Sequence, residues 1–396
     1  MPRFAACVAM VFLLACAGGD GGGGVPPAES DALYAVTVRT PGTPRGAFVA
    51  LVDSLEAGPD VDLETALEIP NGGIAVGEDR RGRFFAVDGA APQGTVFDVS
   101  PDGTFEPGAT LSIQNFSSAA NNAAAGNFAF ISETKAYIID TLSLLIVVWD
   151  PQDVAITGTV DISDVRVDGR LTLSGAPLMR AGNELVVGLA YVNIDRAFTP
   201  DSTLLFIDVE TDSINRIVEL EDCAQAIDLV LDDSGDLFVG SGVAAVFNRL
   251  SGRSSGTECT VRIPAGTYDV EDYTAFSTRT QGAPAGSLVP LSGSRAFTRV
   301  LDEDLLPEGT TSLGALNAAL AWRWALVDLE DDSVFQVVTD LAPRSGQTSA
   351  FIVDGQTWAT QSEDDFAFTT LVNLSADEPR IGLSAPGLIT NVFRVR

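Results

Sequence analysis

Short apolar runs, each closed by a polar turn, repeat along the chain and predict β-strands. Residues 142–149 are a strong example, since only Ser143 interrupts the run and Asp150 and Pro151 end it. Nine residues separate Asp140 from Asp150, whereas a membrane-spanning helix needs about 20 apolar residues. β-branched and aromatic residues fill the second half of the run, and Asp-Pro is a turn signal. The pattern therefore predicts a buried strand and not a membrane segment.

The same signature recurs seven times: an apolar strand ends in a large residue plus Asp or Asn, and a short polar turn follows. The Asp or Asn residues are Asp53, Asp98, Asp150, Asp208, Asn248, Asp328 and Asn373. Five of the six intervals are 40–58 residues, and the interval from Asn248 to Asp328 is 80. A period of about 40–50 residues that carries four strands is typical of β-propeller blades. We interpret the long interval as insertions, because residues 264–320 offer only one convincing pair of strands.

The second copy predicts a complete blade, with strands A to D in residues 72–79, 82–89, 94–100 and 106–113. The first copy begins with residues 33–40, which match strand B, and residues 388–396 at the C-terminus have no blade of their own. A C-terminal strand that completes the first blade would close the ring and remove a sheet edge.

These patterns predict an all-β, seven-bladed β-propeller with four-stranded blades and a ring closed by the C-terminal strand in the first blade. An eight-bladed ring and two separate β domains are the alternatives. The arrangement resembles the seven-bladed YVTN-type and related periplasmic propellers, and the resemblance extends from about residue 33 to the end of the chain.

The N-terminus has the pattern of a bacterial export signal: Arg3 precedes an apolar stretch too short to span a bilayer. Residues 13–16, Leu-Leu-Ala-Cys, resemble a lipoprotein lipobox, which implies cleavage before Cys16 and lipid on its sulfur. An ordinary signal peptide with a chance cysteine is the alternative. Ala17 stands where Asp would imply inner-membrane retention, so we expect anchoring in the outer membrane, on its periplasmic or its surface side.

The predicted organisation is therefore a signal peptide at residues 1–15, the lipidated Cys16 with a Gly- and Pro-rich tether at 16–32, and the propeller at 33–396. An exported chain that keeps Cys223 and Cys259 could join them in a disulfide. Cys223 is expected near the end of blade 4, and Cys259 at the start of strand D in blade 5.

Charge and composition limit the partners and the kinds of catalysis that the chain can support. Acidic residues outnumber basic ones by 54 to 23, for a net charge of −31, which disfavours nucleic acid as a partner. The chain has no His, so Ser-His-Asp and Cys-His catalysis and His metal ligands are excluded. The acidic segments 232–236, 329–333 and 362–366 lack the spacing of a calcium loop and are interpreted as turns. No metal site or cofactor is predicted, and calcium alone stays open.

In propellers, B–C loops and the D–A connections between blades share one face. The longest segments of this chain, residues 114–127, 163–175, 193–202, 264–283 and 302–320, are all assigned to this long-loop face, where loops usually carry function. Arg offers a planar fork to anions, and exposed aromatic residues serve recognition. The predicted recognition patch for a ligand or partner comprises Arg166, Arg170, Arg196, Tyr268, Tyr273, Arg279 and Arg299.

Two function classes follow. The first is a non-catalytic binding or scaffold module on the outer membrane, for which the resemblance to lipoprotein propellers implies a place beside a nutrient or siderophore receptor. The second is a propeller enzyme, either a calcium-dependent lactonase-like hydrolase or a quinone-dependent dehydrogenase. Because the sequence contains neither a catalytic His nor a repeated quinone-binding motif, it favours the binding module and assigns no catalytic residue.

Overall fold

The computed structural model describes residues 32–42, 46–77, 81–116, 127–180, 182–193, 198–251, 258–363, 365–375 and 378–396. The chain from Ala32 to Arg396 is one compact unit. The predicted signal peptide, Cys16 and Arg196 lie outside the described residues. Among the described residues, no helix has the length and apolar character that crossing a membrane requires.

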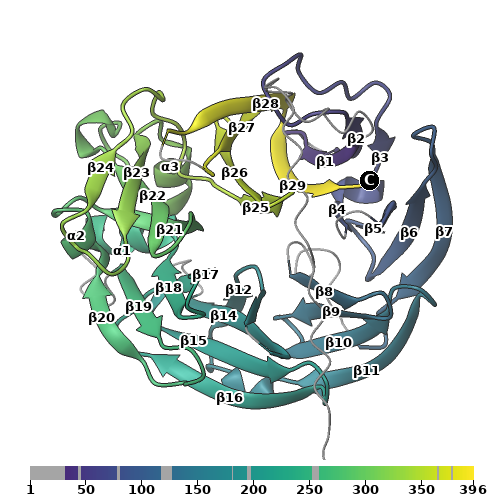
Figure 1. Ribbon diagram of the computed structural model, residues 1–396, viewed down its shortest axis with the longest axis horizontal. Helices are drawn as coiled ribbons and strands as arrows, with labels where there is room; N and C mark the ends of the chain where they lie inside the picture. The colour runs from purple at the N-terminus through teal and green to yellow at the C-terminus, as the bar shows by residue number, and fades with distance from the viewer. Residues whose placement is uncertain are drawn as a thin grey trace, which may run out of the picture. The chain divides into compact units, whose positions relative to one another are not determined.

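Seven antiparallel sheets surround a common centre, and each is a blade (Figure 1). The C-terminal strand pairs with the first strand of the unit, from Tyr34 opposite Arg394 to Arg39 opposite Leu388. The ring is thus closed within blade 1, and the predicted seven-bladed, all-β fold is confirmed.

The strands of each blade are given from the innermost to the outermost. Blade 1 contains β29 (Leu388–Arg394), β1 (Tyr34–Arg39), β2 (Ala47–Val52) and β3 (Leu67–Glu68). Blade 2 contains β4 (Ile74–Gly77), β5 (Arg83–Val87), β6 (Gln93–Val99) and β7 (Phe105–Ser112). Blade 3 contains β8 (Phe128–Ser132), β9 (Lys135–Asp140), β10 (Leu145–Asp150) and β11 (Ala155–Asp161).

Blade 4 contains β12 (Leu171–Ser174), β14 (Glu184–Val192), β15 (Phe198–Asp208) and β16 (Ser213–Leu220), and β13 (Leu178–Arg180) also pairs with β14. Blade 5 contains β17 (Ala226–Leu231), β18 (Leu237–Ser241), β19 (Cys259–Ile263) and β20 (Glu271–Ala275). Blade 6 contains β21 (Ala285–Pro290), β22 (Arg295–Leu301), β23 (Trp322–Asp328) and β24 (Phe335–Val337). Blade 7 contains β25 (Ala350–Val353), β26 (Gln356–Ser362), β27 (Phe368–Asn373) and β28 (Arg380–Pro386).

Short helices occupy connections. They are η1 (Pro70–Gly72), η2 (Ser163–Val165), η3 (Val243–Ala245), α1 (Val246–Leu250), α2 (Phe276–Arg279), η4 (Glu303–Leu305) and α3 (Leu313–Ala318).

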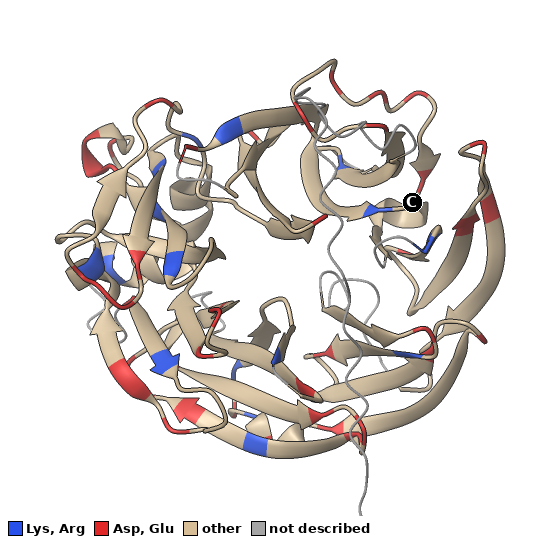
Figure 2. Ribbon diagram, in the orientation of Figure 1, with Lys and Arg blue, Asp and Glu red and all other residues tan. Residues whose placement is uncertain are grey.

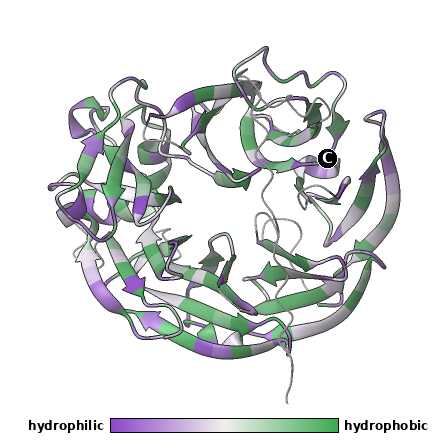
Figure 3. Cartoon of the chain, viewed as in Figure 1, coloured by the Kyte–Doolittle hydropathy of each residue, from purple (hydrophilic) through white to green (hydrophobic). Residues whose placement is uncertain are grey.

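The core lies between neighbouring blades, because the middle strands are apolar on both faces. In β10, Ile146 and Val148 pack toward blade 4, while Val147 and Trp149 pack toward blade 2. Outer strands alternate with exposed residues instead, as in β11 and β16. Figure 3 shows this gradient, from apolar inner and middle strands to paler and polar outer ones. Such double-sided burial explains why the sequence showed apolar runs in strand C and not alternation.

Strand C ends in a turn capped by its Asp or Asn in several blades. The Asp150 carboxylate accepts hydrogen bonds from the backbone N–H groups of Gln152 and Asp153, and Asp208 and Asp328 accept equivalent pairs. The repeated acidic position therefore has a structural role in the turn.

One of the seven predicted copies is wrong. The segment before Asn248, predicted as a strand C, forms η3 and α1, and strand C of blade 5 is β19. The buried Asn248 amide donates to the carbonyl of Phe198 at the start of β15, a long-range contact that the local pattern does not show. With β19 in place, the strand C ends at residues 208, 263 and 328 are 55 and 65 residues apart, so the 80-residue gap disappears.

Two segments predicted as long loops contain strands. Residues 163–175 include η2 and the inner strand β12, and residues 264–283 include the outer strand β20 and α2. β12 (LTLS) and β20 (EDYTA) were missed because they are four and five residues long and carry too few apolar residues to predict a strand. The B–C segment of blade 6, residues 302–320, lies between β22 and β23 as predicted and carries η4 and α3. In blade 4 the predicted loop 193–202 is too long, because residues 198–202 already belong to β15, and residues 194–197 lie outside the described residues.

Candidate functional site

Part of the predicted recognition patch lines an open pocket beside blade 4. This blade 4 pocket has a volume of about 620 Å³ and lies between the connection that follows η2, the first residues of β15 and the end of β16. Arg166 and Arg170 line it together with five carboxylates, those of Asp164, Asp201, Glu219, Glu221 and Asp222. Among its described residues, negative charges thus outnumber positive ones. The acidic residues of the unit are spread around the ring and its turns (Figure 2).

Two predicted tyrosines lie near this pocket. Tyr273 is 46% exposed, and its hydroxyl donates to the backbone carbonyl of Asp222, a pocket residue. Tyr268 borders an adjoining hollow along the outer edge of β16 and donates to the Glu184 carboxylate at 2.7 Å, a bond that raises the pKa of Tyr268. The structure therefore brings Arg166, Arg170 and Tyr273 together around the blade 4 pocket. Tyr268 lies instead in the C–D turn between β19 and β20, on the face opposite the long loops, so its predicted place on the long-loop face is wrong.

The other two arginines of the patch are buried. Arg279 is 4% exposed, donates to Thr260 Oγ1 at 2.7 Å, and pairs with Asp332 at 2.8 Å. Arg299 is fully buried in β22, donates to the carbonyl of Ser345 at 2.6 Å, and lies 4.8 Å over the Trp324 ring. Burial lowers the pKa of Arg299 to about 9. Neither guanidinium reaches the surface of the long-loop face.

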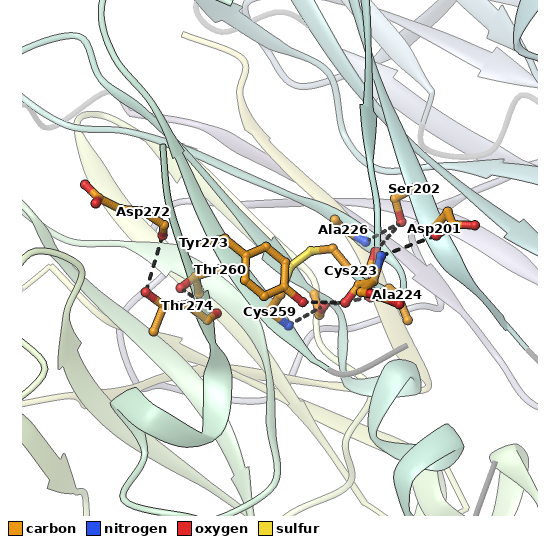
Figure 4. The surroundings of a disulfide bond; sticks show 12 residues. Asp201, Ser202, Cys223, Ala224, Ala226, Cys259, Thr260, Asp272, Tyr273 and Thr274 are labelled. Carbon is orange, nitrogen blue, oxygen red and sulfur yellow. Dashed lines mark hydrogen bonds between the residues drawn. A yellow bond between two sulfur atoms is a disulfide. The ribbon is translucent and has the colours of Figure 1, made fainter. Parts of the chain in front are cut away.

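Cys223 and Cys259 form a disulfide with a Cα–Cα distance of 5.3 Å. Cys223 lies in the connection from blade 4 to blade 5, and Cys259 begins β19, which is strand C and not the expected strand D. Figure 4 shows the ring of Tyr273 beside the disulfide. The bond thus fixes the connection that also forms one wall of the blade 4 pocket.

Two of the acidic segments, 232–236 and 329–333, together bring three carboxylates close enough to share a cation. Asp232, Asp236 and Glu330 each place an oxygen within 4.8 Å of the others. The guanidinium of Arg262 pairs with Asp236 and lies 3.9 Å from Glu330, and Asp232 accepts from the N–H groups of Ser234 and Asp236. Charge neutralisation by Arg262 and the turn bonds account for this cluster.

A second candidate site was not anticipated from the sequence. Asp228 lies on β17, the innermost strand of blade 5, and its Oδ2 accepts a hydrogen bond from the backbone N–H of Leu288 on β21 at 3.1 Å. The hydroxyl of Ser287 also donates to it. Asp228 keeps partial solvent exposure, yet surrounding protein raises the pKa of its carboxyl to about 7.

The backbone around Asp228 is irregular on both blades. Ser287 has a φ of 64°, and Gln225, three residues before Asp228, has a φ of 52°. The ladder shifts register at Ile227 in β17 and at Ser287 in β21, so each innermost strand carries a bulge at the same level. Gly286 is required there, because a Cβ would lie 2.6 Å from the backbone of Gly242.

Gln225, Asp228 and Ser287 together are called the inner-strand site. Within the part of the chain that the structure describes, the buried Oε1 of Gln225 has no hydrogen-bond partner. Its side chain contacts Gly242, which in turn faces Gly286. Bulges and left-handed residues that persist beside a carboxyl of raised pKa are typical of functional sites. The site can accept a proton at neutral pH, when Asp228 is partly ionised.

No family model matches the chain, and no curated protein matches it. Among solved structures, a periplasmic gluconolactonase of Pseudomonas aeruginosa is similar, with a TM-score of 0.55, 11% identity, and coverage of 92% of this chain and 99% of that chain. A candidate 6-phosphogluconolactonase of Bacteroides fragilis has a TM-score of 0.55, 12% identity, and coverage of 94% and 100%. At such low sequence identity, the structural similarity shows a shared fold and nothing more.

One signal in the sequence points to Asp228. The stretch Ala226–Leu231 is apolar except for this one carboxylate, and an ionisable residue inside an apolar strand is costly unless it has partners or a function. The partners, Ser287 and Leu288, come from the next blade, about 60 residues later in the chain, so no local pattern could identify them.

Proposed function

We propose that the protein hydrolyses a small, neutral lactone, with Asp228 as the general base. The observation that carries the proposal is the carboxyl of Asp228, which belongs to a half-buried residue of an innermost strand, is bonded to the next blade, and has a pKa near 7. A general base works best when its pKa lies near the working pH. A carboxylate of ordinary pKa would be ionised but far weaker as a base.

In the proposed step, the Asp228 carboxylate removes a proton from a water molecule as the water oxygen attacks the lactone carbonyl carbon. The bond between that carbon and the ring oxygen then breaks, and the proton returns to the leaving alkoxide. The product is a hydroxy acid, and Asp228 is restored as a carboxylate. Ser287, which donates to Asp228, would hold the carboxylate oriented toward the water.

The substrate class is supported by charge and by fold. A protein with a net charge of −31 favours a neutral substrate over an anion and repels the hydroxy acid anion once it forms. The similar propellers of Pseudomonas aeruginosa and Bacteroides fragilis are named for lactones of gluconic acid and its 6-phosphate. Of these two classes, the uncharged sugar lactone suits this acidic chain better.

The test is the rate at which γ- and δ-lactones of sugar acids open, followed by pH-stat above the spontaneous rate. We expect the rate to rise with pH through about 7, as Asp228 ionises. Asp228→Asn should lower the rate by about 10²-fold or more, whereas Asp233→Asn, in an exposed turn five residues away, should not change it. Opening at the spontaneous rate for every lactone, or full activity of Asp228→Asn, would contradict the proposal.

A second candidate function is binding without catalysis, and the blade 4 pocket favours it. Two guanidinium groups and five carboxylates around about 620 Å³ offer hydrogen-bond donors and acceptors to a polar, hydroxyl-rich ligand of low net charge. Calorimetry with neutral sugars and sugar lactones tests this function. The double variant Arg166→Ala, Arg170→Ala should weaken ligand binding in the blade 4 pocket and leave the rate of lactone opening at Asp228 unchanged. A lower rate of lactone opening in this variant would argue that binding and hydrolysis share one site.

The location of the protein is likewise a proposal. Lipid on Cys16 would tether the ring to the outer membrane through the segment at residues 16–32, beside whatever receptor or ligand it serves. Labelling of cells with a radioactive fatty acid should mark the protein, and Cys16→Ser should abolish the label and release the protein from the membrane fraction. Label that persists in Cys16→Ser would refute the lipobox interpretation.

A further inference from the structure

Blades 2 and 3 enclose a second pocket, on the face opposite the long loops. Its volume is about 300 Å³, and it lies among the A–B turn residues Arg81 and Glu133 and the C–D turn residues Pro151 and Gln152. We call it the blade 2–3 pocket. It shares no residue with the inner-strand site or with the blade 4 pocket.

Aromatic side chains form its inner wall. The Trp149 ring lies 4.9 Å from the Phe85 ring and 6.1 Å from the Phe130 ring, measured between centroids. All three line the pocket, and Trp149 is 1% exposed. Aromatic walls at these separations suit a planar ring, which can add an offset or edge contact to the cluster.

The indole N–H of Trp149 is buried and has no hydrogen-bond partner among the described residues. Buried indole N–H groups usually have an acceptor, and leaving one unpaired is unfavourable. Trp149 lines the pocket, so a ligand that displaces the atoms now covering the indole edge can supply the missing acceptor. The indole N–H of Trp324 is unpaired too, but it belongs to blade 6, outside this pocket.

The charges at the rim are already balanced. Arg83 pairs with Asp98 at 2.7 Å and also donates to the carbonyl of Pro151, and Arg81 pairs with Glu133 at 3.2 Å. Each guanidinium thus has its own carboxylate, so the rim calls for no charged ligand. A volume of about 300 Å³ equals the liquid volume of about ten waters, which limits the ligand to a single substituted ring.

We propose that the blade 2–3 pocket binds a neutral planar ring that carries a carbonyl group. The ring packs against Phe85, Phe130 and Trp149, and the carbonyl oxygen accepts the hydrogen bond from Trp149 Nε1. This site is separate from the proposed hydrolysis at Asp228, so either proposal can fail without the other.

The experiment uses acetophenone and isopropylbenzene, which have the same number of non-hydrogen atoms and similar shapes but differ in the acceptor. Protein labelled with 15N-tryptophan is titrated with each, and the Nε1–H resonances are followed by NMR. We expect the Trp149 resonance to shift and that of Trp324 to stay. Acetophenone should bind about tenfold more tightly than isopropylbenzene, the difference that one hydrogen bond provides, and benzoate more weakly than acetophenone.

Two variants complete the test. Trp149→Phe keeps an aromatic wall and removes the donor, so the tenfold preference for acetophenone should vanish while isopropylbenzene still binds. Gln152→Trp, at the exposed rim, should block both probes without disturbing the core. The proposal is overturned if the Trp149 resonance does not move with either probe, or if benzoate binds more tightly than acetophenone. It is also overturned if Trp149→Phe still prefers acetophenone to isopropylbenzene, or if Gln152→Trp binds both probes as tightly as the unmutated protein.

Discussion

The disulfide between Cys223 and Cys259 should contribute measurably to stability. It closes a segment of 36 residues that runs from the blade 4–5 connection, through β17 and β18, to β19. Both cysteines are fully buried, so we expect the bond to persist in mild reductant. Its main effect is to restrict the unfolded chain, since a cross-linked loop has fewer conformations to lose on folding.

The magnitude follows from loop length. For a sequence separation of 36, the chain-entropy relation gives a loss of about 13 cal/mol/K, or about 4 kcal/mol at 25 °C. Unfolding entropy is about 2.1 cal/mol/K per residue, which makes about 0.8 kcal/mol/K for the unit from Ala32 to Arg396. Loss of the disulfide should therefore lower the unfolding midpoint by about 5 °C.

The assay is calorimetric unfolding of the protein in its oxidised form, after reduction in denaturant and refolding with reductant, and as the Cys223→Ala, Cys259→Ala double variant. The reduced protein and the double variant should both unfold about 5 °C earlier, and reductant should have no effect on the double variant. Equal midpoints for the oxidised and reduced proteins would refute the entropic argument. A much larger loss would show that the bond also holds the blade 4–5 connection in its folded geometry.

Three further predictions concern single side chains. Asp150→Ala removes the acceptor of two turn N–H groups and should lower the free energy of unfolding, measured by denaturant titration, by about 1 kcal/mol. The control variant Asp153→Ala should have a free energy of unfolding within about 0.5 kcal/mol of the unmutated protein. Arg279→Met breaks a buried network and should cost about 2–3 kcal/mol in the same assay, while Arg166→Met, at an exposed position, should not; equal costs would contradict the assigned roles. The raised pKa of Asp228 means that the folded state binds the proton more tightly than the unfolded state, so stability should fall as pH rises from about 4 to about 7, and Asp228→Asn should remove this slope in unfolding curves recorded across that range.

The ring and most of its blades could be predicted because each blade repeats one local pattern. An apolar strand C, a capping Asp and a tight turn are all encoded within about ten neighbouring residues, and the caps at Asp150, Asp208 and Asp328 confirm that local chemistry. Closure of the ring was also predictable, since the first copy lacked a strand A and the C-terminal strand lacked a blade.

Blade 5 shows where the local pattern misleads. Its true strand C, β19, is only five residues long and contains Arg262, while the apolar stretch before Asn248 resembles a strand in composition and forms a helix. The choice between them depends on pairing with β18 and β20, which is long-range information. A local reading favoured the longer apolar run, and the assignment of residues around Cys259 shifted by one strand.

The candidate sites were harder to predict than the blades, because their residues meet partners from distant parts of the chain. Exposed Arg166 and Arg170 could be placed near one another because they lie on a single connection, but Arg279 and Arg299 could not be recognised as buried, since their neighbours come from other strands. Asp228 was harder still to recognise from the sequence. An acid within an apolar inner strand, facing a bulged serine in the next blade, contradicts the local preference of both strands. Where local rules fail on two neighbouring blades at the same level, function is the simplest reason for the cost to be retained, and this is why Asp228, not the conspicuous arginines, is the residue to test first.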